Sequence, residues 1–355
     1  MFRYLNRNSS FVDTPRLSEA VRHRDGSRVF SLDLIRALAI TLVIAEHTIP
    51  VNDPTSPWRW LSPVFAINAP LFFIISGALL LPVSRRIGTF IRRRASRVLI
   101  PFAFWSFIFA WLYYHFTDAN IDFLASQIRW FWLRFTFPEA WFIPILLSMY
   151  LFYPVISPWI RTATLPRYRY FLILWAAALS LPFIENFSGD FVFNTSIFGT
   201  FYGCLGYAVA GVCLMRYPLL SSRGRQRRIA VIAILALVGF ALPYIIIAVP
   251  KLYDTYGQRM SEAISVTTAA AAVLVFALLA PIKIKGHNLV RQGVTFIARI
   301  SFPMYFIQPM LTRYVIPNCC PELMESNWLF PAVLVGSIIV AIPIRAIPLL
   351  RKFLG

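Results

Sequence analysis

The sequence predicts an all-α fold, a polytopic bundle of about ten transmembrane helices with both termini in the cytoplasm. Three observations lead to this prediction. The chain of 355 residues is 58% hydrophobic and only 14% charged, and its mean hydropathy is +0.66, which is typical of multi-pass membrane proteins. Ten apolar stretches are long enough to cross a bilayer. Basic residues also alternate between successive connections, as an alternating topology requires.

Each predicted span is an apolar stretch close to the length of about 20 residues that a membrane helix needs. In chain order the stretches cover residues 31–50, 63–82, 97–116, 139–159, 168–184, 194–215, 228–248, 263–281, 296–316 and 328–349. The stretch at 168–184 is the shortest of them.

Charge placement supports the same count. The N-terminal tail carries six arginines and the segment "RRIGTFIRRRASR" carries six more, and most of the 34 Lys and Arg residues fall on this side of the predicted bundle. Because Lys-rich and Arg-rich connections stay in the cytoplasm, an even number of spans with cytoplasmic ends fits best. Basic residues beside membrane helices also meet anionic lipid, so the formal net charge of +19 does not imply a nucleic-acid partner.

We divide the chain into a cytoplasmic tail, residues 1–30, and a transmembrane domain, residues 31–350. The tail is polar and lacks the apolar core and cleavage site of a signal peptide. The four cysteines form no CxxC pair, so we assign no metal or bound cofactor.

The first predicted span, "SLDLIRALAITLVIAEHTIP", contains four ionisable residues in an otherwise apolar run: Asp33, Arg36, Glu46 and His47. Ionisable groups inside a membrane segment are costly and often mark a functional site. Taken singly, a boundary arginine can extend toward lipid head groups and a boundary histidine can sit at the interface without any chemistry.

Arg36 and His47 share one helical face. Eleven residues correspond to about 1100° of rotation, three turns plus about 20°, and to about 16 Å along the axis. Asp33 is placed to pair with Arg36, whereas Glu46 points about 100° away from His47. A histidine can act as a base or a nucleophile, and an arginine can bind phosphate. The aligned pair therefore suits group transfer from an anionic donor.

Two further stretches of the sequence contribute candidate residues to this site. In "APLFFIISGALLL", Ser76 and Gly77 allow a close approach of two helices. The next connection holds a dense arginine cluster. Such a cluster can serve orientation and lipid contact, or it can recognise the phosphates of a coenzyme A donor. Its members are Arg92, Arg93, Arg94 and Arg97.

Four stretches occur in an order that is specific enough to resemble a known family: "LDLIRALAITLVIAEH", "PLFFIISG", "RRRASRVLIPFAFWS" and "AWFIPILLSMYLFYPVI", with a weaker fifth, "ISFPMYFIQP". The chain resembles the acyltransferase type 3 family, integral membrane enzymes that are widespread in bacteria and modify cell-surface glycans. The first stretch matches the family's motif of an arginine and a histidine separated by ten residues.

The resemblance implies a multi-pass protein of the bacterial inner membrane that uses acetyl-CoA, or another acyl-CoA, as co-substrate. In the family the first-helix arginine and histidine are implicated in catalysis, and the arginines of the connection after the second span are implicated in donor binding or activity. We accordingly predict His47, Arg36 and Glu46 as catalytic residues, with Glu46 adjusting the basicity of His47. The predicted donor-binding residues are Arg94, Arg97, Arg93 and Ser76. In the ninth-span motif, "ISFPMYFIQP", members of the family often carry a histidine before the proline. This chain has Gln308 there, which can hydrogen-bond but cannot take up a proton.

The expected function is O-acyl transfer, with acetyl as the first choice, from cytoplasmic acyl-CoA to a hydroxyl of a cell-surface or periplasmic glycan. His47 acts either as a general base or as a transient acyl carrier. Two other functions stay open: a multi-pass exporter of a glycan or lipid-linked precursor, and an inactive relative that serves as a sensor or assembly partner. The expected partners are the donor, the glycan acceptor and membrane lipid, and homo-oligomer formation is left open.

Overall fold

The computed structural model describes residues 29–51, 53–116, 138–188, 197–219, 224–284 and 288–347; of these, the side chains of residues 138, 181, 182, 184–188, 197–202, 258 and 259 are not described. Every secondary-structure element in these ranges is helical, which confirms the predicted all-α class. The predicted N-terminal tail lies outside the described residues except at its last two positions.

The α-helices, in chain order, are α2 (Phe30–Thr48), α3 (Ser62–Phe65), α4 (Asn68–Leu80), α5 (Ile87–Phe116), α7 (Phe142–Thr162), α8 (Leu165–Ser188), α9 (Ile197–Arg216), α10 (Arg225–Ala236), α11 (Leu242–Ala248), α12 (Pro250–Met260), α13 (Val266–Leu279), α14 (Leu289–Met310), α15 (Ile316–Cys319) and α16 (Leu329–Ala346). Three short 3-10 turns are η1 (Pro57–Leu61), η2 (Pro138–Trp141) and η6 (Pro321–Leu323). Two wide π-helical turns, η4 (Leu237–Ala241) and η5 (Leu311–Val315), continue α10 into α11 and α14 into α15.

Each of the ten predicted windows contains a helix in the structure. Among the described residues, five helical segments are long and apolar enough to cross a membrane: Pro57–Leu80, Ile87–Phe116, Glu139–Thr162, Arg225–Ala248 and Leu329–Ala346. The first predicted span, α2, is not among these five, because three charged residues in its 19 positions reduce its apolar character. The count of ten spans and the cytoplasmic ends therefore stay predictions.

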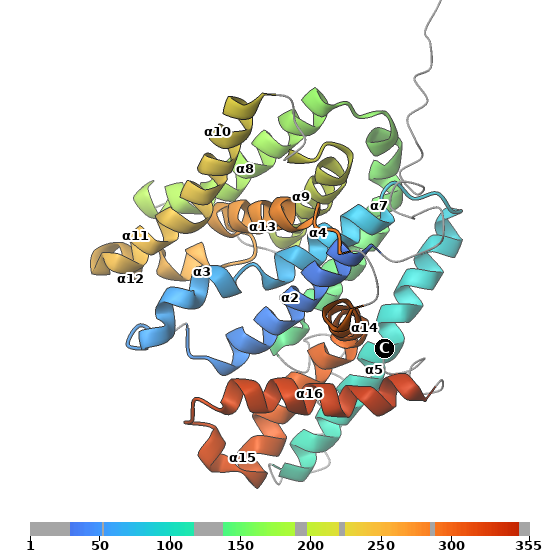
Figure 1. Cartoon of the computed structure of the whole chain (residues 1–355), viewed down its shortest axis with the longest axis vertical. Coiled ribbons are helices and arrows are strands. Elements are labelled where there is room, and N and C mark those ends of the chain that lie inside the picture. Colours follow the sequence, from blue (N-terminus) through green and yellow to red (C-terminus); the bar gives the residue numbers. More distant parts are fainter. Residues whose placement is uncertain are drawn as a thin grey trace, which may run out of the picture.

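The helix α2 occupies the middle of the bundle and packs between α4 and α14. Helix α9 packs on α4, and α16 packs on α14 at the lower edge of Figure 1. Helices α8, α10, α11 and α13 form the upper left part of the same view. The helix that carries the four ionisable residues of the first predicted span thus lies in the middle of the bundle, with the side chain of His47 exposed near its C-terminal end.

Helices α4 and α9 approach each other closely through glycine. A Cβ atom added at Gly77 of α4 would overlap the backbone of Ala208, and one added at Gly211 of α9 would overlap the carbonyl oxygen of Ile74. Small residues of this kind let two helix backbones meet. The structure therefore shows the close helix approach that the "SG" dipeptide predicts.

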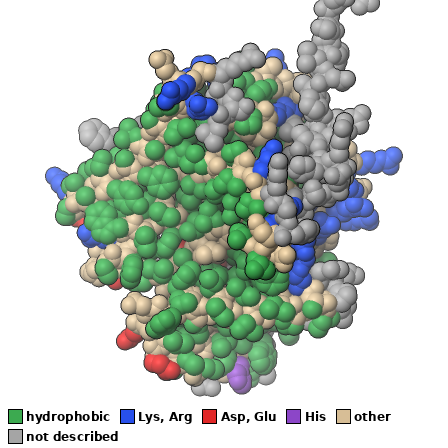
Figure 2. Space-filling model, in the orientation of Figure 1, with side chains coloured by type: hydrophobic (Ala, Val, Ile, Leu, Met, Phe, Trp, Pro, Cys, Tyr) green, Lys and Arg blue, Asp and Glu red, His purple; other side chains and the backbone are tan. Residues whose placement is uncertain are grey.

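Large apolar side chains cover much of the outer surface (Figure 2). Phe107, Val155 and Ile173 each expose more than half of their surface. In the same view Lys and Arg side chains gather mainly at the top and along the right edge, whereas Asp and Glu lie toward the lower left. An apolar exterior with charges at its edges is what a protein surrounded by lipid needs.

Candidate active site

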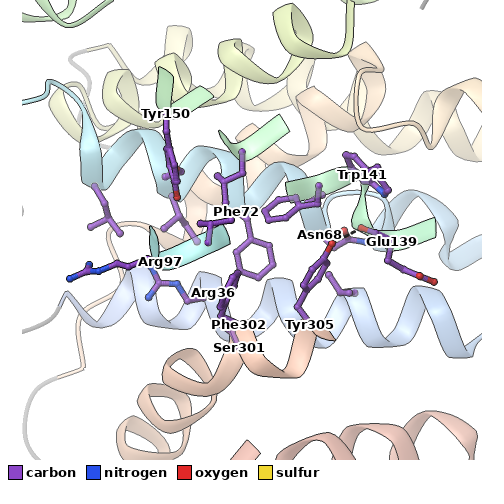
Figure 3. Close-up of a pocket in the computed structure, with 18 of the residues that line it drawn as sticks. Arg36, Asn68, Phe72, Arg97, Glu139, Trp141, Tyr150, Ser301, Phe302 and Tyr305 are labelled. Carbon is purple, nitrogen blue, oxygen red and sulfur yellow. Dashed lines mark hydrogen bonds between the residues drawn. The ribbon is translucent and has the colours of Figure 1, made fainter. Parts of the chain in front are cut away.

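A cavity of about 260 Å³ opens beside α2 in the middle of the bundle. Helices α2, α4, α5, α7 and α14 and the turn η2 supply its walls (Figure 3). Its polar and charged lining residues are Arg36, Glu46, His47, Asn68, Ser76, Arg94, Arg97, Glu139, Tyr150, Ser301 and Tyr305. Apolar side chains such as Phe72, Leu146 and Phe302 line the rest.

The charges in this cavity are separated by sign. Arg36 and Arg97 lie at one end of the view in Figure 3, and Asn68 and Glu139 lie at the other, with Phe72 between them. An anionic ligand group therefore has a favourable place at only one end.

The basic end is built by two helices. On α2, a guanidinium nitrogen of Arg36 lies 3.7 Å from a carboxylate oxygen of Asp33, which is the pair that the spacing predicts. Helix α5 begins at Ile87, ten residues before the predicted window, so the arginine cluster lies on its first turns and not in a loop. Arg94 and Arg97 are three positions apart and line the cavity together.

Arg93 does not line the cavity, although its two neighbours in the cluster do. Adjacent residues on a helix project about 100° apart, so Arg93 turns away from the wall that Arg94 forms. Its side chain is exposed. The structure thus separates Arg93 from the six other predicted site residues, all of which line this one cavity.

At the other end, Glu46 is held by α4. The side-chain amide of Asn68 donates to Oε2 of Glu46 at 2.6 Å, and the same nitrogen also donates to the carbonyl oxygen of Phe65 at 2.8 Å. Asn68 is buried, so its amide is a fixed donor. The hydrogen-bond partner of Glu46 in the structure is therefore Asn68, and its predicted effect on His47 would be electrostatic.

His47 is held from the opposite side by α14. Its Nδ1 atom lies 3.0 Å from Nε2 of Gln308, whose side chain is completely buried. Because His47 lines the cavity and its Nδ1 is engaged, ring atom Nε2 is the nitrogen left for a reacting group.

An ion pair between a buried carboxylate and an exposed guanidinium supports the same end. Arg313, in the π-helical turn η5, donates to Oε1 of Glu139 at 2.6 Å, and the Tyr305 hydroxyl donates to the backbone oxygen of Glu139. Glu139 and Arg313 both lie close enough to act electrostatically on the His47 ring. This pair connects the start of α7 to the end of α14 beside the histidine.

Ser76 has a defined partner as well. The hydroxyl of Tyr153, on α7, donates to Oγ of Ser76 at 3.0 Å, and Tyr153 is completely buried. One turn earlier on α7, Tyr150 lines the cavity. The Ser-Gly dipeptide therefore joins α4 to α7 through Ser76 and to α9 through Gly77.

Sequence reasoning missed several residues of the site: Asn68, Glu139, Tyr150, Tyr305 and Arg313. Asn68 sits one residue before the "APLFFIISG" motif and Glu139 two residues before Trp141, so both border stretches that were already singled out. Arg313 is 174 positions from its partner Glu139, and no local pattern indicates that contact.

Comparison with known proteins gives a family match that covers most of the chain. The family described as the acyltransferase domain matches residues 29–346, nearly the whole chain. No curated protein and no solved structure matches the chain. With the apolar helices described above, this match identifies a membrane acyltransferase, and the chain belongs to the acyltransferase 3 family.

Proposed function

We propose that this protein is an O-acyltransferase of the bacterial inner membrane, which moves an acyl group, with acetyl as the first choice, from cytoplasmic acyl-CoA to a hydroxyl of a cell-surface or periplasmic glycan. The observation that carries the proposal is the cavity that joins the three arginines Arg36, Arg94 and Arg97 to His47. Family membership supports acyl transfer as the reaction class.

The three arginines are suited to the donor. Guanidinium groups bind phosphate through paired, charge-assisted hydrogen bonds, and coenzyme A carries several phosphates. From these arginines the acyl-pantetheine arm would run along the apolar wall formed by Phe72 and Leu146 toward His47. In this arrangement the arm and its acyl group would occupy the cavity, whose volume is about 260 Å³, and the nucleotide would stay at its basic end.

His47 supplies the chemistry in one of two ways. As a general base, its free ring nitrogen takes the proton of the acceptor hydroxyl while the oxygen attacks the thioester carbonyl. The carbon–sulfur bond then breaks, and the imidazolium returns the proton to the leaving thiolate. As an acyl carrier, the same nitrogen first displaces the thiolate and then passes the acyl group to the hydroxyl, whose proton goes to the ring and from there to the thiolate. Both routes end in an ester and free coenzyme A.

The proposal is tested in inverted membrane vesicles from the source cells, which retain the natural acceptor. Acetyl-CoA added outside such vesicles meets the cytoplasmic face, and the free thiol released over time reports transfer. We expect release by vesicles that contain the wild-type protein and none above background with His47→Ala at equal protein abundance. Equal release by both samples would contradict the proposal.

A further inference from the structure

We propose that Gln308 is a positioning residue that selects the reactive tautomer of His47: its side-chain oxygen accepts a hydrogen bond from the Nδ1–H group and thereby leaves Nε2 unprotonated. The use of that nitrogen in acyl transfer rests on the proposed function. The contact itself does not.

The two side chains meet across the interface between α2 and α14. Nδ1 of His47 lies 3.0 Å from the side-chain nitrogen of Gln308. Gln308 is completely buried, and within the described part of the chain its Oε1 atom has no hydrogen-bond partner. Oε1 is therefore available to accept a hydrogen bond from the ring when the amide rotates by half a turn.

The contact allows two proton arrangements. In one, the amide nitrogen donates to an unprotonated Nδ1, and the ring proton sits on Nε2. In the other, the amide has rotated by half a turn, and Oε1 accepts from Nδ1–H. The oxygen and nitrogen of an amide have nearly the same shape, so the choice between them follows from the hydrogen-bond network.

Catalysis distinguishes the two arrangements. A base or nucleophile at Nε2 needs that nitrogen free of its proton, which requires the proton on Nδ1. After Nε2 has taken a proton, Nδ1 still carries its own, so an accepting oxygen suits the ring before and after proton transfer. An amide N–H pointing at the ring would oppose the protonated state. Only the arrangement with Oε1 toward Nδ1 therefore serves the whole reaction.

A neutral orienting group also fits the surroundings of the ring. Glu139 of η2 and Arg313 of η5 already place charges around His47, and Glu46 of α2 and Tyr305 of α14 line the same cavity. A carboxylate at position 308 would add a negative charge that the protonated imidazole has to balance. An amide orients the imidazole without one, and it cannot itself act as a second base.

Activity measurements test this assignment in the inverted vesicles with acetyl-CoA. Gln308→Leu removes the accepting oxygen, whereas Gln308→Glu keeps it. We expect Gln308→Leu to lower maximal turnover on the order of 100-fold, the usual contribution of a positioned base, with an unchanged KM for acetyl-CoA. Gln308→Glu should stay within about 10-fold of wild type, because tautomer selection is retained. Unchanged turnover in Gln308→Leu, or equal losses in both variants, would overturn the proposal.

A matched control separates the loss of turnover in Gln308→Leu from the effect of removing any buried polar side chain. Ser337 on α16 is completely buried, and its Oγ has no hydrogen-bond partner among the described residues. It lies outside the cavity lining. Ser337→Ala should therefore leave turnover at the wild-type value, and a loss as large as that of Gln308→Leu would count against a specific role for Gln308.

A spectroscopic measurement reads the tautomer directly. The chain has four histidines, so in protein with ¹⁵N-labelled histidine the signals that vanish in His47→Gln belong to His47. We expect a proton-bearing Nδ1 and a proton-free Nε2 in the wild type, and a strong predominance of the opposite tautomer, with its proton on Nε2, in Gln308→Leu. A wild-type ring with its proton on Nε2 would overturn the proposal. This measurement needs no turnover, so its failure is distinct from a failure of the proposed function, which would appear as a wild-type protein that releases no coenzyme A.

Discussion

Arg93 and Arg97 are four positions apart on α5 but have different surroundings, because only Arg97 lines the cavity. Both side chains are exposed, so neither makes a buried packing contact. This difference offers a matched pair of substitutions. It separates specific recognition of a donor phosphate from a general attraction between a basic surface and an anion.

We predict that Arg97→Ala raises the KM for acetyl-CoA by about 10- to 100-fold, since a hydrogen bond to a charged group contributes about 1.5–3 kcal/mol. Arg93→Ala should leave KM unchanged. Initial rates of thiol release at varied acetyl-CoA give both values. Equal effects of the two substitutions would show that the cluster acts only through its summed charge.

The contact between Glu139 and Arg313 leads to a second prediction at this scale. Arg313→Ala leaves the buried carboxylate of Glu139 without its partner beside His47, and an unpaired buried charge is costly. We expect a lower melting temperature and lower turnover. The double variant Glu139→Gln with Arg313→Ala should recover part of the melting temperature, because it removes the unpaired charge. A double variant that melts below Arg313→Ala would contradict this account.

At the scale of single helices, the packing of α4 on α9 depends on Gly77. Gly77→Ala places a methyl group into the backbone of Ala208, so the helices must separate and shift Ser76 in the cavity wall. We predict less folded protein and lower turnover. Gly88→Ala is the control, since nothing lies within 4 Å of a Cβ at Gly88 and alanine favours a helix by about 1 kcal/mol over glycine. Thermal unfolding in detergent compares the two, and equal melting temperatures would contradict the close contact.

Features that lie within one helix could be predicted from the sequence. The shared face of Arg36 and His47 and the pair formed by Asp33 and Arg36 follow from helical periodicity alone. The contact between His47 and Gln308 could not be predicted, because 261 positions separate the two residues and only packing of α2 on α14 joins them. The start of α5 was also missed, because its first turns are charged and leave the apolar window that a hydropathy reading detects.

At the scale of the whole molecule, the cysteines provide a test of orientation. With ten spans and cytoplasmic ends, the connection between the ninth and tenth spans faces outward. Cys319 in this connection is exposed, whereas Cys204 and Cys213 are buried. A membrane-impermeant maleimide applied to spheroplasts should therefore label the wild type, and the double variant Cys319→Ser with Cys320→Ser should not react. Labelling that occurs only in inverted vesicles would show that this connection faces the cytoplasm, which contradicts the predicted orientation.

The central claim is that the cavity around His47 transfers acyl groups to a glycan, and NMR of surface glycans tests it most directly. Cells that lack the protein would be complemented with wild type or with His47→Ala at matched membrane abundance. The account predicts O-acyl signals with the wild type and their absence with His47→Ala, while the unmodified glycan still reaches the surface. O-acyl signals retained with His47→Ala would contradict the role of His47, and unmodified glycan trapped inside the deletion cells would identify an exporter instead.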